Sequence, residues 1–292
     1  DLDVNIVHDF NSYVNFNNEA LSINIEDEFI DEHHLRERLE GIKNYEFNAE
    51  NFIYEVKNCN VTKAVHVQAA IGTEDPVVET KYIQEQTDKT GYPMVAIADA
   101  SLADSNVENV LERHASYNCF RGIRDFGGGN PDYLEDKEWQ KGYSKLEKYG
   151  PIFCANIFWE DMKKGAQLAS KFPNITFIVD HTGYPQERND EYFSNWKKGI
   201  SEISKVENVW IKISGLGMSD WSWTSETNRP WVEHSVDSFG VNRVIWGSNW
   251  PVDKLFGMYE SLVYSYKKLW ENFTDEEKNR MFKANAEELF NF

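Results

Sequence analysis

The stretch that decides the fold is Arg243-Val-Ile-Trp-Gly-Ser-Asn-Trp-Pro-Val-Asp-Lys-Leu255. It begins with apolar residues that favour a buried strand and changes at Gly247 to small polar residues. Trp250-Pro251 then ends the strand, because proline cannot donate to a sheet ladder and restricts the residue before it. The stretch is therefore either an ordinary strand end with a turn or the active-site mouth of a parallel barrel.

Seven further strand-like segments precede this stretch, and helical segments separate them. The expected strands lie at 2–7, 62–69, 94–98, 120–126, 151–157, 175–181 and 209–215. Strands that alternate with helices are typical of parallel βα units in one sheet. We predict one α/β domain over residues 1–292, a single (β/α)8 TIM barrel with a helical insertion after the first strand, where helical segments are expected at 26–42 and 48–58. A doubly wound sheet is the alternative, but no Gly-x-Gly-x-x-Gly follows an early strand.

Length and composition agree with one large enzyme-like domain. The 292 residues suit a single barrel, and a hydrophobic content of 41% with 10 tryptophans supplies a large core. A formal charge of -19 opposes binding to nucleic acid or to an anionic membrane surface. No segment approaches the roughly 20 apolar residues of a membrane span, and no signal peptide is visible. We expect a small-molecule partner, and the tryptophans leave room for a homo-oligomer interface.

The cysteines indicate the compartment. Cys59, Cys119 and Cys154 have no metal-type spacing, and an odd number gives no disulfide framework. Cysteines used in this way are typical of a reducing environment, so a cytoplasmic location is expected.

Polar residues gather at the expected C-terminal ends of the strands, where such barrels build their active sites. These residues are His8, Asp9 and Asn11; His66 and Gln68; Asp99; Arg121, Arg124 and Asp125; Asn156; Asp180 and His181; Lys212 and Ser214; and Ser248 and Asn249. A purely structural barrel needs fewer of them, because buried polar groups cost free energy unless they are paired. We therefore expect a functional site at this end of the sheet.

Several of these residues also have a structural interpretation. His66 lies in an apolar strand and is either a satisfied core histidine or a pocket residue. Arg121 and Arg124 either pair with nearby carboxylates or bind an anionic substrate group, for which the guanidinium fork is suited. His181 ends an apolar run and is expected to face the pocket. The histidines in expected helices are interpreted as solvated or structural; they are His33, His34, His114 and His234.

A series of motifs follows in order from about residue 61 to the end of the chain. The motifs are Val65-His-Val-Gln-Ala69, Phe120-Arg-Gly-Ile-Arg124, Val179-Asp-His-Thr-Gly-Tyr-Pro185, Lys212-Ile-Ser-Gly-Leu-Gly217, Trp223-Thr224, Arg229-Pro-Trp231, Gly247-Ser-Asn-Trp-Pro-Val252 and Asn285-Ala286. Together they resemble the amidohydrolase superfamily, in the branch that includes sugar lactonases and a pyrone dicarboxylate lactonase. The resemblance implies a barrel hydrolase that directs water at a carbonyl carbon, often in a cyclic ester.

The chain departs from the family pattern at two places. The family's first strand ends in His-x-His, whereas the best match here, Asp9-Phe-Asn-Ser-Tyr13, has Asn11 and Tyr13 instead; His8 is an alternative match. Where the family has an aspartate at strand eight, as base or metal ligand, this chain has Asn249. Zinc favours imidazole, thiolate and carboxylate ligands, and an amide cannot take a proton from water. We therefore expect no cofactor, with zinc or another divalent metal as the alternative.

The first functional hypothesis is a metal-independent hydrolase of a small, carboxylated lactone. The proposed catalytic residues are His181, Asn249, Asp9, Asp180 and His66, and the proposed substrate-binding residues are Arg121, Arg124, Asn11, Tyr13, Gln68 and Trp250. In this hypothesis the arginines hold the carboxylate, a histidine polarises the carbonyl, an aspartate is the base, and Asn249 positions water.

The second hypothesis is a catalytically lapsed barrel that binds a small molecule or a protein without turnover. The loss of a catalytic carboxylate and of metal ligands motivates it, since such losses cost many orders of magnitude in rate. A decarboxylase is a third interpretation that the resemblance permits, and it normally needs the metal.

Overall fold

The computed structural model describes residues 4–8, 47–69, 73–220 and 222–292. In these residues eight strands form one sheet, ordered as they follow one another in the chain. They are β1 (Val4–His8), β2 (Val61–Val67), β3 (Val95–Asp99), β4 (Phe120–Arg124), β5 (Ile152–Ala155), β6 (Thr176–Val179), β7 (Val209–Ile213) and β8 (Val244–Trp246). Every neighbouring pair is parallel. The predicted α/β class with parallel strands is confirmed.

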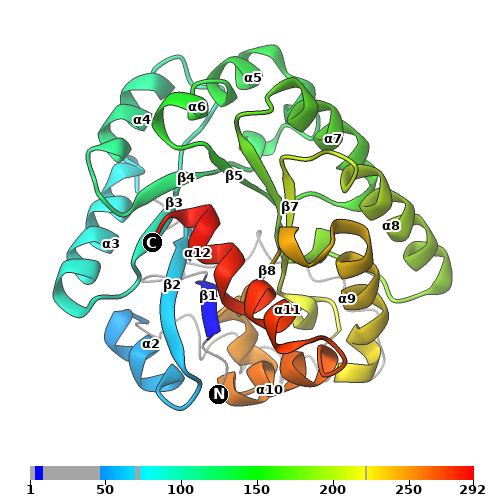
Figure 1. Cartoon of the computed structure of the whole chain (residues 1–292). Coiled ribbons are helices and arrows are strands. Elements are labelled where there is room, and N and C mark those ends of the chain that lie inside the picture. The colour runs from blue at the N-terminus through cyan, green and yellow to red at the C-terminus, as the bar shows by residue number, and fades with distance from the viewer. Residues whose placement is uncertain (1–3, 9–46, 70–72, 221) are drawn as a thin grey trace, which may run out of the picture.

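Helices connect the strands and surround the sheet, as Figure 1 shows. They are α2 (Ala49–Val56), α3 (Val77–Thr90), α4 (Val107–Ala115), α5 (Lys137–Tyr143), α6 (Leu146–Tyr149), α7 (Met162–Lys171), α8 (Asp190–Ile203), α9 (Ser225–Phe239), α10 (Tyr259–Leu269), α11 (Asp275–Asn279) and α12 (Asn285–Phe290). None of these described helices is long and apolar enough to cross a membrane. The helix expected at 26–42 lies outside the described residues, so the insertion stays a prediction. Closure of the sheet into a complete (β/α)8 barrel also stays a prediction.

The two faces of the sheet bury different sets of side chains, because successive strand residues point to opposite faces. One cluster joins strands that are far apart in the sheet order, so it fills the inner face; it contains Val65, Val67, Val95, Ile97, Ile152, Cys154, Ile178 and Ile245. The outer face packs on the helices and includes Ala64, Ile123, Phe153, Phe177 and Ile211. Residues two positions beyond the inner set therefore continue the inner face toward the C-terminal strand ends.

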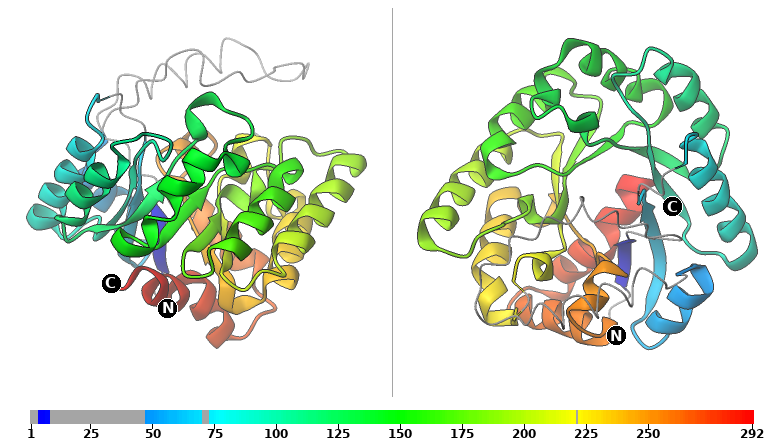
Figure 2. Two further views of the ribbon diagram at one scale, coloured as in Figure 1. Left: turned by 90° about the horizontal axis from the view of Figure 1, so that it is seen from above. Right: turned by 180° about the vertical axis from the view of Figure 1, so that it is seen from behind.

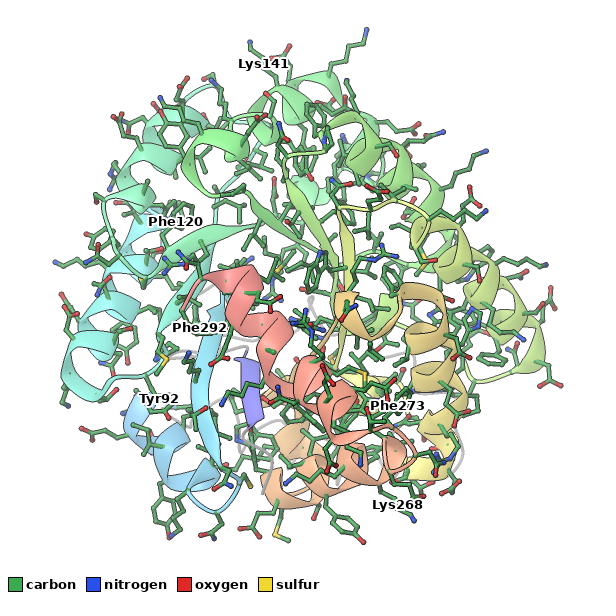
Figure 3. The ribbon with its side chains drawn as sticks, in the orientation of Figure 1. Tyr92, Phe120, Lys141, Lys268, Phe273 and Phe292 are labelled. Atoms are coloured by element: carbon green, nitrogen blue, oxygen red, sulfur yellow. The ribbon has the colours of Figure 1, made fainter. Side chains whose placement is uncertain are left out.

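Helix α12 covers the opposite, N-terminal end of the strands. Ala286 and Phe290 of this helix belong to the inner apolar cluster. At the start of β4, Arg121 Nε donates to Phe290 O (2.6 Å) and Arg121 Nη2 donates to Asn291 O (3.1 Å). Phe292 lies 5.2 Å from the Lys63 ammonium, and it is labelled in Figure 3. The left view of Figure 2 shows these C-terminal helices, in red, on one side of the strands.

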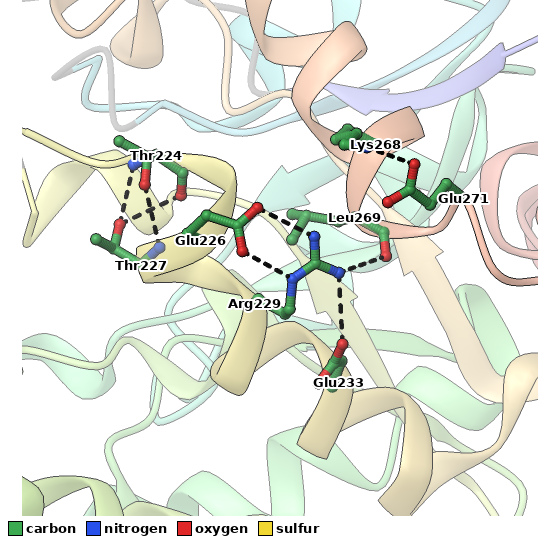
Figure 4. Close-up of polar contacts among 8 residues, drawn as sticks. All are labelled: Thr224, Glu226, Thr227, Arg229, Glu233, Lys268, Leu269 and Glu271. Atoms are coloured by element: carbon green, nitrogen blue, oxygen red, sulfur yellow. Dashed lines mark hydrogen bonds and ion pairs between the residues drawn. The ribbon is translucent and has the colours of Figure 1, made fainter.

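Helix α9 is held by contacts that explain two of the sequence motifs. Thr224 and Thr227 form a capping box, in which each backbone N–H donates to the other residue's Oγ1 (2.9 and 3.2 Å). Arg229 pairs with Glu226 and donates to Leu269 O (3.5 Å), which joins α9 to α10 (Figure 4). Thr224 and Arg229 therefore stabilise this part of the fold.

Candidate functional site

Three charged side chains meet on the inner face, at the C-terminal ends of the strands. Asp180 directly follows β6 and its carboxylate lies between two cations: Oδ1 is 3.2 Å from Lys212 Nζ, and Oδ2 is 3.5 Å from Arg124 Nη1. All three residues are buried, and Asp180 is 0% exposed. We call them the ion triad. Burying charged groups of this kind is costly unless they are well paired.

Arg124 is also held by Gln68, which follows β2. Its Nη2 donates to Gln68 O, and Gln68 Nε2 in turn donates to Arg124 O (3.2 Å). The Phe126 ring, which is 45% exposed, lies 5.3 Å from the Arg124 guanidinium carbon. The structure thus places Gln68 where it orients Arg124.

Asp99 ends β3 beside the ion triad. Its Cα is the register partner of Arg124, and Asp99 lies two residues beyond the inner-face residue Ile97. Burial, together with the negative charges of Glu79 and Asp125, raises the pKa of Asp99 to about 6, although Arg124 opposes this shift. The sequence placed Asp99 among the polar strand ends and indicated it only as an ion-pair partner for the arginines; its raised pKa depends on Glu79 of the distant helix α3.

His66 points away from this group. Val65 and Val67 occupy the inner face, so the intervening His66 faces α3, where its Nε2 lies 2.7 Å from Glu79 Oε1. The same oxygen accepts from Ala69 N (3.1 Å), and both side chains of the pair are buried. This geometry favours the core-histidine interpretation and does not support the catalytic role considered for His66.

His181 begins a turn of unusual backbone conformation. Its φ is +49°, and Thr182 and Tyr184 follow with φ of +59° and +45°. Such angles are uncommon for residues other than glycine and cost of order 1–3 kcal/mol each, which is a feature that clusters at functional sites. The His181 ring is buried, and its Nδ1 lies 3.0 Å from Ser214 Oγ. The chain therefore holds this imidazole in one orientation.

Asn249 follows β8 with a φ of +52° and is buried. Its Nδ2 donates to Asp253 Oδ1 (2.7 Å), and Asp253 N donates to Asn249 O (2.9 Å). The next residue, Trp250, turns toward α2 and α10: its Nε1 donates to Glu55 Oε2 (2.8 Å) and its ring packs on Tyr259. This placement does not support substrate contact by Trp250.

Arg121 lies at the opposite end of the strands from Arg124. Its guanidinium is occupied by carbonyl oxygens, including those of Phe290 and Asn291. The expected substrate role of Arg121 is therefore not supported, because it is the second residue of the strand that Arg124 ends. Three other candidates, Asp9, Asn11 and Tyr13, lie outside the described residues.

The described residues do not fit a divalent-metal centre of the imidazole and carboxylate type. Among them, no three His, Cys, Asp or Glu side chains come together in a metal-binding arrangement. His181 Nδ1 is next to a serine hydroxyl, and the buried Asn249 after β8 offers an amide, which is a poor zinc ligand.

Comparisons with known proteins agree with this fold. A family model described as amidohydrolase matches residues 29–292. The protein y4mH of Sinorhizobium fredii is 35% identical over 247 residues, which cover 81% of this chain and 83% of y4mH. The L-fucono-1,5-lactonase of Burkholderia ambifaria is 24% identical and covers 68% of each chain. A crystal structure of an amidohydrolase from Burkholderia multivorans with bound zinc has a TM-score of 0.83 at 16% identity, over 99% of both chains.

The ion triad predicts a large stability effect of Lys212→Met. Removing one cation leaves the buried Asp180 carboxylate with Arg124 alone, so we expect a loss of roughly 3–5 kcal/mol in the free energy of unfolding. Urea denaturation measures it. The control is Lys81→Met in the exposed pair with Glu85, which should change stability by less than about 0.5 kcal/mol. Equal effects of the two substitutions would contradict a stabilising role of the ion triad.

The close contact between Gly215 and His181 predicts a local effect of Gly215→Ala. It has a φ of +64°, and a Cβ there would lie 2.7 Å from His181 Nδ1. Gly91 has a φ of +80° in the same left-handed region as Gly215, but a Cβ there meets nothing within 4 Å. Gly91→Ala should cost about 1 kcal/mol for backbone conformation alone, whereas Gly215→Ala should cost roughly 2–4 kcal/mol and displace the imidazole. Denaturation and the NMR signals of His181 measure both, and an unchanged His181 in Gly215→Ala contradicts the prediction.

Proposed function

The chain belongs to the amidohydrolase family, and we propose that it hydrolyses a small lactone that carries a carboxylate. The observation that carries this proposal is the Arg124 guanidinium of the ion triad, which lies at the C-terminal ends of the strands and is oriented by Gln68. A guanidinium can bind a substrate carboxylate through two parallel hydrogen bonds. The lactonase name of a relative supports a cyclic ester as the reacting group.

In the proposed reaction the oxygen of a water molecule attacks the lactone carbonyl carbon. The ring C–O bond then breaks, and the leaving oxygen receives a proton, so the product is an open hydroxy acid. Arg124 binds the substrate carboxylate, with its guanidinium oriented by Gln68. His181, oriented by Ser214, polarises the carbonyl, and Asn249 positions the water.

We propose that this reaction proceeds without a resident metal. The proposal rests on the chemistry of the available donors, since Asn249 is an amide where the family resemblance implies a carboxylate. We also retain as proposals the single domain over residues 1–292, the closed (β/α)8 barrel with its insertion after β1, and a cytoplasmic location.

A lapsed enzyme is the second candidate, and one contact favours it. The Asn249 amide donates to Asp253, which keeps a neutral group bonded to a neighbouring side chain at the family's catalytic position. In that case the chain binds a carboxylated small molecule but does not open its ring.

The substrate proposal predicts the effect of Arg124→Lys. Wild-type protein should hydrolyse a carboxylated lactone in a pH-indicator assay. The substitution should raise KM for this lactone about tenfold or more, because an ammonium cannot make the bidentate contact, and should change little for an uncharged lactone of the same ring size.

Arg121→Lys is the matched control, since it changes the same residue type in the same strand at the other end and should leave both KM values unchanged. If Arg124→Lys affects both lactones equally, Arg124 does not recognise the carboxylate. If wild-type protein binds the carboxylated lactone in calorimetry and never opens it, the lapsed enzyme is the correct interpretation.

Metal removal gives an independent prediction. Dialysis against a strong chelator should leave the lactonase rate within about twofold of the untreated protein, because no step in the proposed reaction uses a metal. Elemental analysis of the same sample verifies that metal was removed. A rate that falls with the metal content and returns with added zinc would refute the metal-independent reaction.

A further inference from the structure

The proposed hydrolysis needs a group that accepts the proton of the attacking water. Asn249 stands where the family resemblance implies that group, and its amide has no such capacity at neutral pH. The described carboxylates near the C-terminal strand ends are Glu79, Asp99, Asp125, Asp180 and Asp253. Four of these carboxylates have structural partners among the described residues, and Asp99 does not.

Asp180 is fully buried between two cations. Both oxygens of Asp125 accept hydrogen bonds within the chain. Oδ2 accepts from Leu102 N (2.9 Å) and Trp139 Nε1 (2.7 Å), and Oδ1 accepts from Gly127 N (2.9 Å). These contacts turn the chain after β4. Both carboxylates therefore have structural partners that a proton would disturb.

Glu79 and Asp253 also have structural partners. Glu79 Oε1 contacts His66 and accepts from Ala69 N, on the outer side of β2. Asp253 Oδ1 accepts from Asn249, and the residue is buried.

Asp99 differs from all four. Its carboxylate makes neither a hydrogen bond nor an ion pair with any residue in the described part of the chain, and it is partly exposed. Its backbone is anchored, because Asp99 O lies 3.0 Å from His114 Nε2, and His114 Nδ1 lies 2.8 Å from Thr80 Oγ1. The Asp99 backbone is thus held in place next to Arg124, while its carboxylate makes no hydrogen bond within the described part of the chain.

We propose that Asp99 is the general base that takes the proton from the attacking water. This inference rests on the proposed lactone hydrolysis. The water oxygen bonds to the carbonyl carbon as its proton passes to an Asp99 oxygen. When the ring C–O bond breaks, the protonated Asp99 gives that proton to the leaving oxygen, so the carboxylate is regenerated and the atoms balance.

The surroundings of Asp99 agree with this role. Four charged or titratable groups face Asp99. They are Glu79 of α3, Arg124 at the end of β4, Asp125 directly after β4, and His114 of α4. Burial and the two carboxylates raise the pKa of Asp99 to about 6. A base with such a pKa is mostly ionised at neutral pH and still accepts a proton well.

The test uses kcat/KM for the carboxylated lactone as a function of pH. We expect an acidic limb near pH 6 in the wild-type protein, since protonation of Asp99 removes the base. Asp99→Asn should lower kcat by roughly 10²–10⁴-fold with little change in lactone affinity, and its residual rate should lack this limb. Asp99→Glu should recover part of the rate. Asp104→Asn, in the exposed loop after β3, removes the same charge and should behave like wild type.

Thermal unfolding verifies that the variant is folded. A carboxyl whose pKa is raised on folding stabilises the protein below its unfolded pKa, and this contribution is lost as pH rises through about 6. Asp99→Asn should therefore have a Tm at pH 8 that is equal to or above the wild-type value, with a smaller gain at pH 4.

The outcomes separate the two proposals. If wild-type protein hydrolyses the lactone and Asp99→Asn retains its kcat, Asp99 is not the base and the proposed function stands. An Asp9→Asn variant that alone abolishes turnover leads to the same conclusion. If wild-type protein opens no lactone, both proposals fail. Should Asp99→Asn not fold, a wild-type profile without a limb between about pH 5 and 7 overturns the inference.

Discussion

The position of the Asp180 carboxylate between Arg124 and Lys212 is the constraint on which the site depends. It ties β4, β6 and β7 together on the inner face, just beyond a layer of aliphatic side chains. With Asp180 held there, the chain enters its left-handed turn at a defined point, and His181 reaches Ser214. The neighbouring Asp99 carboxylate lies close to the same charges. One buried cluster therefore positions the Arg124 guanidinium, the His181 imidazole and the Asp99 carboxylate.

Strand periodicity explains why some residues join this cluster and others do not. Asp180 continues the inner face two residues beyond Ile178, whereas His66 lies between two inner valines and turns outward. A polar residue in a strand that is buried on both faces must find a partner wherever it points. Asp180 finds cations from other strands, and His66 finds Glu79 from a helix. Residue type alone does not distinguish these two situations.

The alternation of strands and helices, and the gathering of Arg124, Asp180 and His181 at one end of the sheet, could be predicted, because periodicity and strand order are local features of the sequence. The placement of Arg121 could also be predicted, because it is the second residue both of the strand expected over 120–126 and of β4, which stops at Arg124. The surroundings of Asp99 depend on Glu79, a contact that only the folded chain creates. The direction of Trp250 could not be predicted for a similar reason, because its partner Glu55 is nearly two hundred residues earlier.

The covering of the inner apolar cluster by α12 has a consequence for folding. Phe290 is 0% exposed and belongs, with Ala286, to a cluster that also contains residues from β2, β3, β5, β6 and β8. An intermediate in which α12 has not docked leaves the underside of the sheet exposed to water. Strand β1, which contacts α12, lacks one of its neighbours in the same intermediate. Apolar surface and strand edges exposed in this way favour aggregation, so the docking of α12 protects the folding chain.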